Sequence, residues 1–254
     1  TVVARQLSRA AHPENVFTRM YPDLPTFAPQ TATARAAMQR MGARGDLFDA
    51  EDNLTDPIQS ILNPAVFSPH NPDNPNMTAG MTFLGQFLDH DITFDKRSVL
   101  NANAQPGQTV NFRTAAFDLD SVYGNGPAGS PELYDTSSGR IKFILQRIPG
   151  AEAVSRNGAP RNDVPRDAQG NAIVAESRND ENVVISQIQV ALLSFHNRIT
   201  DHLAAQPAYR GATAQRLFDD ARRLVTWHYQ WIILHEFLPL TIGQDRLDAI
   251  MRGG

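Results

Sequence analysis

The sequence has no cysteine among its 254 residues, which excludes disulfide bonds, thiolate metal sites and a cysteine nucleophile. It also has no basic excess, because 23 Lys and Arg stand against 27 Asp and Glu, for a formal net charge of −4. This balance argues against nucleic acid as a partner, since nucleic-acid-binding proteins usually present a basic face. No apolar run approaches the ~20 residues of a membrane-spanning helix, so no transmembrane segment is expected.

Alternating, strand-like patterns are scarce, and the regular patterns present are helical. Apolar residues recur every three or four positions, which is the spacing of one buried helix face. The predicted helices cover residues 31–42, 79–91, 182–206 and 212–239. The first is expected to stop at Gly42 and the last near Pro239. The predicted fold class is therefore mainly α with long irregular loops.

The middle of the chain, residues 96–176, is rich in turn-forming residues, and only 141–148 looks regular. A loop region of this length is often functional or organised around something other than its own core. No internal repeat or linker divides the sequence. Residues 1–254 are therefore expected to belong to one domain, with an extended N-terminal segment at 1–75 and a core at 76–254.

The stretch GQFLDHDITFD, residues 85–95, sets charged groups among large apolar side chains, where they are costly to bury unless paired. On a helix, Gln86, Asp89 and His90 occupy positions i, i+3 and i+4 and share one face. An amide, a carboxylate and an imidazole would then line one wall of a site. A helix end whose polar residues simply meet solvent is the alternative.

A second cluster of oxygen donors occurs in RTAAFDLDSVYGNG, residues 113–126, where Asp118 and Asp120 alternate with apolar residues and Thr114 precedes Asp118 by four. Such an arrangement suits Ca²⁺, which takes ~6–8 oxygen ligands. The spacing is not that of an EF-hand loop. A turn stabilised by aspartate side chains explains the pattern equally well, so both interpretations stay open.

The segment ESRNDEN, residues 176–182, precedes the third predicted helix. Asn179 or Asp180 is the expected N-cap, with Glu181 in the first turn, where a carboxylate favours the helix dipole. This interpretation leaves Arg178 unexplained.

Three further histidines carry less information. His228 and His235 lie seven residues apart on the last predicted helix and are expected to be a core or surface pair, whereas His196 is expected to pack between helices.

Taken together, five motifs resemble the animal-type haem peroxidases of the peroxidase–cyclooxygenase superfamily. They are GQFLDHDITFD, RTAAFDLDSVYGNG, SRNDEN, SFHNRITDHL and HEFLPLTIG, and in this order they span residues 85–243. The resemblance implies the animal haem peroxidase fold. It also implies a haem-dependent peroxidase that reduces H2O2 and oxidises a small organic or halide donor.

The resemblance also implies a role for individual residues. His90 is the distal histidine, which moves a proton between the two oxygens of H2O2, and Arg178 stabilises the negative charge that develops as the O–O bond breaks. Gln86 lines the same cavity. Asp89 and Glu181 match the two carboxylates that form ester links to haem b in several members of the family.

A Ca²⁺ site is implied by the same resemblance, and it would hold the residue next to His90 and tie two distant segments together. The implied ligands are Asp91, Thr114, the backbone oxygen of Ala116, Asp118 and Asp120.

The family's proximal histidine, the axial ligand of the haem iron, lies in an R-x-G-H-like segment well beyond the EFLP motif, and this sequence has no such segment. We expect a second chain or a further C-terminal segment to supply it, and the 254 residues alone to bind haem poorly. The radical-forming tyrosine of the family's dioxygenases lies in the same missing region. Peroxidase and fatty-acid dioxygenase activity are therefore not separated by the residues present.

Two functions of other classes compete with these. One is a non-catalytic peroxidase-like protein used for adhesion or as a scaffold, and the other is a metal-dependent phosphohydrolase in which DHD supplies a metal-ligand pair. The complete set of His90, Arg178 and Gln86 favours a peroxidase. A secreted or otherwise extracytoplasmic location is expected.

Overall fold

A computed structural model of the chain describes residues 28–49, 74–99, 109–151 and 161–253, with a few isolated positions before residue 64. The chain divides into two compact units, one of residues 19–78 and the other of residues 1–18 and 79–254. That all of these residues form one domain stays a prediction.

The smaller unit contains helix α1 (Ala32–Met41), which confirms the helix predicted at 31–42. Thr31 is its N-cap and accepts a hydrogen bond from the backbone N–H of Ala34. Gly42 ends the helix and donates its N–H to the last carbonyls.

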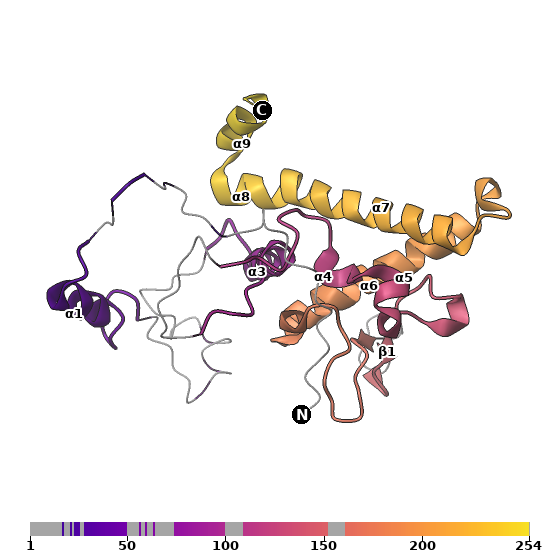
Figure 1. Ribbon diagram of the computed structural model, residues 1–254, viewed down its shortest axis with the longest axis horizontal. Helices are drawn as coiled ribbons and strands as arrows, with labels where there is room; N and C mark the ends of the chain where they lie inside the picture. Colours follow the sequence, from indigo (N-terminus) through magenta and orange to yellow (C-terminus); the bar gives the residue numbers. More distant parts are fainter. Residues whose placement is uncertain are drawn as a thin grey trace. The chain divides into compact units, whose positions relative to one another are not determined.

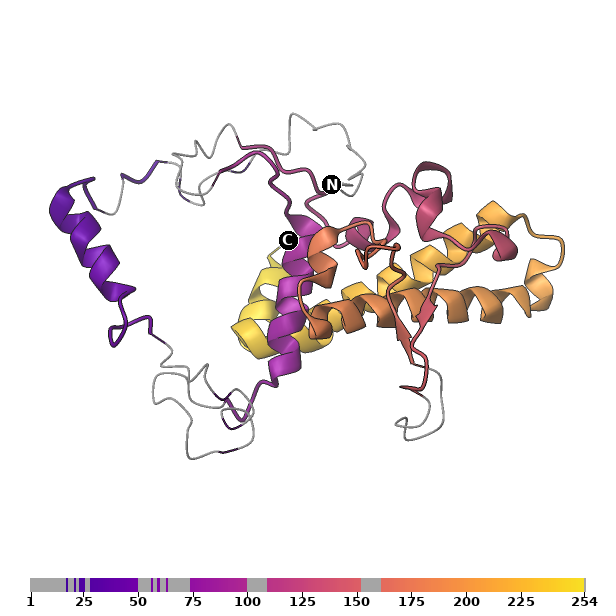
Figure 2. The same cartoon turned by 90° about the horizontal axis from the view of Figure 1, so that it is seen from below.

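The larger unit is built on three long helices, α3 (Ala79–Ile92), α6 (Val183–Ala204) and α7 (Ala214–Ile232). Helices α6 and α7 lie side by side, and α3 contacts α6 (Figure 1, Figure 2). The shorter elements are α4 (Asp120–Tyr123), α5 (Gly126–Gly129), η3 (Pro131–Leu133), η4 (Thr136–Ser138), β1 (Gln146–Arg147), β2 (Asn162–Asp163), η6 (Ser177–Asp180), η7 (Pro207–Tyr209), η8 (Ile233–Phe237), α8 (Leu238–Ile242) and α9 (Gln244–Arg252). No helix in the described part of the chain is both long and apolar enough to cross a bilayer.

Regular strand structure within the described residues is limited to a short antiparallel pair, in which Gln146 faces Asp163 and Arg147 faces Asn162. The regular run predicted at 141–148 is thus reduced to β1. The mainly helical class with long irregular connections is confirmed.

The core lies where α3, α6 and α7 meet the segment that contains α4. Its fully buried side chains come from all four parts, so one apolar cluster joins segments far apart in the sequence. Among its members are Phe87, Leu119, Val122, Tyr123, Ile185, Leu193, Phe218, Val225 and Tyr229.

The N-terminus of α6 differs from the prediction, because its N-cap is Asn182 and neither Asn179 nor Asp180. The Asn182 side chain accepts hydrogen bonds from the backbone N–H groups of Val184 and Ile185. Residues Ser177–Asp180 form the separate 3₁₀ turn η6. Glu181 therefore precedes the helix, and the first turn of α6 has no acidic residue.

Pro239 does not end the last long helix as predicted. After α7 the chain widens into the π-helical turn η8 and continues as α8, with Pro239 in its first turn. Proline lacks a backbone N–H, and a proline within helical backbone is accompanied by a local irregularity, which here is the π-helical turn before it. The helix ends at Gly243, whose φ of 83° suits glycine.

His196 packs at the centre of the core, in agreement with its predicted role. Its ring lies against Tyr123, Phe143 and Phe218, with ring centroids 5.1–5.4 Å away. Nε2 lies 2.9 Å from the carbonyl oxygen of Ile141, so Nε2 carries the hydrogen and Nδ1 accepts from the Tyr123 hydroxyl at 3.0 Å. Burial lowers the pKa of His196 to about 4.

We predict that His196 makes the protein sensitive to acid. Between pH 6.5 and 4 the unfolded chain binds a proton on this histidine that the folded protein does not bind. The free energy of unfolding therefore falls with falling pH, by at most about 1.4 kcal/mol per pH unit from this group. The variant His196→Gln should be less stable at pH 7 but should show a shallower dependence over this range in urea unfolding.

The exposed His202 offers a matched control. His202→Gln should keep the slope of the original protein, and an unchanged slope in His196→Gln would contradict the assignment.

Candidate functional site

The polar face predicted on α3 lies opposite the residue that links η6 to α6. Gln86 Nε2 donates a hydrogen bond to Glu181 Oε2 at 2.9 Å, and His90 Nε2 lies 3.8 Å from the same oxygen. Asp89 is exposed, and its carboxylate accepts from the Thr93 hydroxyl instead. The structure thus brings Gln86, His90 and Glu181 together and leaves Asp89 at the open side of the group.

The orientation of His90 is fixed by a buried amide that the sequence interpretation had treated as a helix cap. His90 Nδ1 lies 3.0 Å from Asn179 Oδ1, and Asn179 Nδ2 donates to Gln189 Oε1 at 2.9 Å. With the amides oriented by this network, Nδ1 must be the protonated ring nitrogen. In the neutral ring of this tautomer, the Nε2 lone pair is the proton acceptor.

Arg178 is held at the C-terminal end of α3. Its Nε and Nη2 donate to the two oxygens of Glu176 at 3.0 and 3.1 Å. Nη2 also donates to the backbone oxygens of His90 and Thr93, and the guanidinium lies over the ring of Phe94. Among the described residues, no acceptor is hydrogen-bonded to Nη1.

Glu176 is a buried residue of the candidate site that the sequence did not predict. Its side chain is fully buried, and it accepts hydrogen bonds from the guanidinium groups of both Arg178 and Arg113. Burial raises the pKa of this carboxyl, but the Arg178 hydrogen bond and the charge of Arg113 outweigh it, and the net pKa is lowered. Only the neighbouring acid and arginine in ESRNDEN hinted at this pairing, whereas Arg113 lies 63 residues away.

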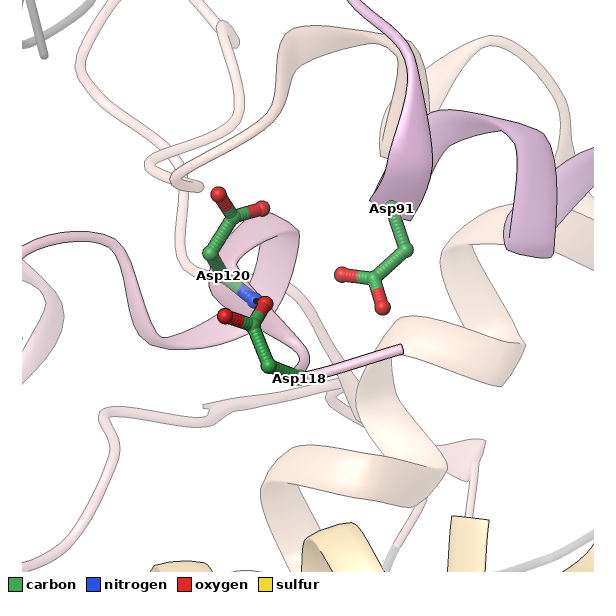
Figure 3. A group of neighbouring side chains, drawn as sticks. All are labelled: Asp91, Asp118 and Asp120. Carbon is green, nitrogen blue, oxygen red and sulfur yellow. Dashed lines mark hydrogen bonds between the residues drawn. The ribbon is translucent and has the colours of Figure 1, made fainter. Parts of the chain in front are cut away.

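The oxygen donors predicted in two separate motifs come together as a carboxylate cluster. One oxygen from each of Asp91, Asp118 and Asp120 lies within 4.8 Å of the others, and the three side chains lie next to one another (Figure 3). Asp91 is fully buried and accepts hydrogen bonds from Leu119 N and from the Ser121 hydroxyl. Burial, with some repulsion from Asp120, raises the pKa of Asp91 to about 6.

Two further predicted ligands lie on the same loop with different outcomes. Thr114 is beside the cluster, because its N–H and hydroxyl both donate to Asp120 Oδ2, at 3.1 and 3.0 Å. The backbone oxygen of Ala116 accepts from Asp118 N, and nothing else places it in the cluster. Asp120 also lies 3.5 Å from Arg113, so the cluster touches the arginine that binds Glu176.

The charges around this cluster match a divalent cation. Four carboxylates (Asp91, Asp118, Asp120 and Glu176) and two guanidinium groups (Arg113 and Arg178) carry a formal charge of −2. Carboxylate and hydroxyl oxygens are the ligands that a hard cation such as Ca²⁺ prefers. A bound divalent ion would bring this largely buried set to neutrality.

His228 on α7 and His235 in η8 lie at the surface. His228 donates from Nδ1 to the carbonyl oxygen of Leu224 at 2.7 Å, and His235 stacks on Trp231 with centroids 4.8 Å apart. Both are exposed. Of the predicted alternatives of a core or a surface pair, the surface pair is correct.

Comparison with protein families assigns the chain to one family. The family described as animal haem peroxidase matches residues 95–252, which is more than half of the sequence. The chain belongs to this family. The match begins after His90, so the grouping of residues on the polar face of α3 is supported by the geometry described above and not by the family match.

Among curated proteins, the chain is similar to the peroxidase of Drosophila melanogaster, with 27% identity over 186 residues. That alignment covers 72% of this chain and 25% of the fly protein. Thyroid peroxidase of Homo sapiens is 27% identical over 161 residues, covering 57% of this chain and 16% of the human protein. The chain therefore spans a quarter or less of the length of these relatives.

Solved structures support the fold. A fatty acid alpha-dioxygenase of Oryza sativa, in its Y379F form with palmitic acid, matches 71% of this chain with a TM-score of 0.51 and 14% identity, over 32% of its own length. The corresponding enzyme of Arabidopsis thaliana matches 71% of this chain with a TM-score of 0.51 and 16% identity, over 30% of its own length. At this identity the likeness concerns the fold alone.

We predict that Asn179 sets the tautomer of His90. Replacing Asn179 with Leu removes the acceptor for Nδ1–H, so the Nε2–H form should gain population. Nitrogen-15 NMR of the imidazole ring distinguishes the two forms. Asn179→Asp keeps an acceptor and serves as the control, and a ring that stays protonated at Nδ1 in Asn179→Leu would contradict the prediction.

Proposed function

We propose that this chain carries the peroxide-binding side of a haem peroxidase, which reduces H2O2 and oxidises a small organic or halide donor. The observation that carries the proposal is the His90 imidazole, which is held by Asn179 with Nε2 as a proton acceptor beside Gln86. The named peroxidases among its sequence relatives support the same activity.

The residues present fit a haem group by their chemistry. Asp89, which precedes His90 on α3, and Glu181, 3.8 Å from His90 Nε2, are exposed carboxylates, and they would hold haem b, with ester links as the proposed attachment. When bound, the haem iron supplies the redox chemistry of peroxide reduction. The polypeptide supplies position and charge.

His90 is the proposed general acid and base. Its Nε2 takes a proton from one oxygen of H2O2 and returns it to the oxygen that departs, which suits an imidazole because its ordinary pKa lies near neutrality. Arg178, fixed through Glu176 and with Nη1 available, stabilises the negative charge that develops. Gln86 holds water or halide next to His90.

We also propose a Ca²⁺ ion at the carboxylate cluster, with Asp91, Thr114, the backbone oxygen of Ala116, Asp118 and Asp120 as ligands. The proximity of the three carboxylates and the formal charge of −2 around them support it. Because Asp91 follows His90 on α3, such an ion would fix the end of the helix that carries the catalytic imidazole.

The axial ligand of the haem iron is proposed to come from a further segment or a second chain. His196 is buried among aromatic rings, and His228 and His235 are engaged at the surface of α7 and η8. In the relatives, three quarters or more of the protein lies outside the part that this chain matches. We expect the 254 residues alone to bind haem poorly, and the extracytoplasmic location also stays a prediction.

A fatty-acid dioxygenase is the second candidate, because the structural neighbours carry that name. Their identity of 14–16% supports the fold and not the substrate, whereas the sequence relatives above are named peroxidases. A donor assay with a phenol, a halide and a fatty acid on the whole haem-loaded protein separates the two activities. Absence of turnover with all three would favour the scaffold alternative.

In the whole haem-loaded protein, His90→Ala should slow the reaction with H2O2 by about 10²–10⁴, the usual contribution of general acid–base catalysis. Stopped-flow absorbance at the haem band measures this rate. His235→Ala removes an exposed histidine and should leave the rate unchanged. A full rate in His90→Ala would refute the proposed role.

Ca²⁺ should raise the thermal unfolding midpoint of the protein relative to EDTA, because a ligand that binds only the folded state stabilises it. Asp118→Asn should reduce this shift by removing a ligand charge. Asp248→Asn, which makes the same charge change on α9, should preserve it. An equal shift in all three proteins would exclude the carboxylate cluster as the site.

A further inference from the structure

A network of charged side chains joins the carboxylate cluster to Arg178, the proposed catalytic arginine. Asp120 Oδ1 lies 3.5 Å from Arg113 Nη1, and Arg113 donates through Nε and Nη2 to Glu176 Oε2. Glu176 in turn binds Arg178 through both of its oxygens. This network runs from Asp120, the first residue of α4, to Arg178, which binds the end of α3.

The first three side chains of this network, Asp120, Arg113 and Glu176, are buried. Glu176 has no exposed surface, and the side chains of Arg113 and Asp120 are 10% and 2% exposed. Charges in such surroundings interact far more strongly than they do in water. A change of charge at Asp120 therefore alters the electrostatic energy of Arg113, and through Arg113 that of Glu176.

Arg113 stands between two competing acids, and the balance between them depends on the cluster. Without a cation, the three aspartates attract Arg113 toward Asp120. A divalent ion bound to the aspartates offsets that attraction and repels the guanidinium, which then binds Glu176 alone. Arg113 is also tied to the Glu176 side by the carbonyl oxygen of Ala175, at 3.3 Å.

We propose that Arg113 and Glu176 are positioning residues that couple cation binding at the aspartate cluster to the placement of Arg178. This inference rests on the cation site proposed above and adds to it a route by which the ion acts on the peroxide-binding side. Neither residue is proposed to touch the peroxide. Coupling of this kind is reciprocal, so changes at Glu176 must alter cation affinity.

The Glu176→Gln variant provides the test. Without the carboxylate charge, Arg113 loses its ionic partner at position 176 and pairs with Asp120, so an incoming cation must displace it. We expect the Kd for Ca²⁺, measured by calorimetry on the purified chain, to rise about tenfold. In the Arg113→Gln background the competing guanidinium is absent, and adding Glu176→Gln should change the Kd by less than about twofold.

Two control variants address folding and nonspecific charge effects. Glu176→Asp keeps the charge and should restore much of the affinity. Asp180→Asn removes a carboxylate from the same turn, but that carboxylate is bound by Arg166 and lies outside the network of charged side chains. It should leave the Kd unchanged.

A second measurement reports on Arg178 itself. The Nε–H resonance of Arg178 should shift on addition of Ca²⁺ in the unmodified chain and should stay in place in Arg113→Gln. The Nε–H of Arg166, which pairs with Asp163 and Asp180, is an internal reference and should not respond.

The outcomes separate this inference from the proposed site. If the unmodified chain binds no Ca²⁺, the cation site fails and the coupling fails with it. If Ca²⁺ binds but Glu176→Gln leaves the Kd unchanged, or lowers affinity equally in both backgrounds, the site stands and the coupling through Arg113 is overturned.

Discussion

The rest of the site depends on the ion pairs that the buried carboxylate of Glu176 makes with Arg113 and Arg178. An ionised carboxylate without water is costly unless it is paired and fully hydrogen-bonded, and Glu176 meets this condition by accepting from two arginines and from the Arg178 backbone. This pairing fixes Arg178 against the end of α3, fixes Arg113 beside Asp120, and ends the loop before η6. One residue thus connects three segments that the chain keeps far apart.

The helical framework could be predicted from the sequence because it depends on local patterns. The 3.6-residue apolar period located α3, α6 and α7, and Gly42 marked the end of α1. The errors arose where several local rules competed. Asn179, Asp180 and Asn182 are all plausible caps, and only tertiary contacts turn Asn179 toward His90 and leave Asn182 to cap α6. The prediction that the helix ends near Pro239 was wrong because a π-helical turn precedes this proline and the helical backbone continues through it.

The candidate site could be predicted only in part, for the same reason. Gln86 and His90 share a helix face by their spacing, and alternating aspartates suggested oxygen ligands in the 118–120 segment. The residues that orient these groups were missed, because their partners are distant in sequence. Asn179 meets His90 across 89 residues, and Arg113 meets Glu176 across 63. No period or spacing in a single sequence encodes such pairs.

The geometry of α3 explains how one helix end can meet two different environments. Successive residues on an α-helix are turned by about 100°, so Gln86 and His90 point to nearly the same side while Asp91 points to another. The imidazole side is lined by Gln86 and Glu181, and the Asp91 side is closed by Ser121 and the aspartates of the neighbouring loop. The ion and the reacting group proposed above would then be separated by a single backbone step of α3. Since Arg178 also binds the His90 carbonyl, the two sides are linked through the backbone of α3 as well as through Arg113 and Glu176.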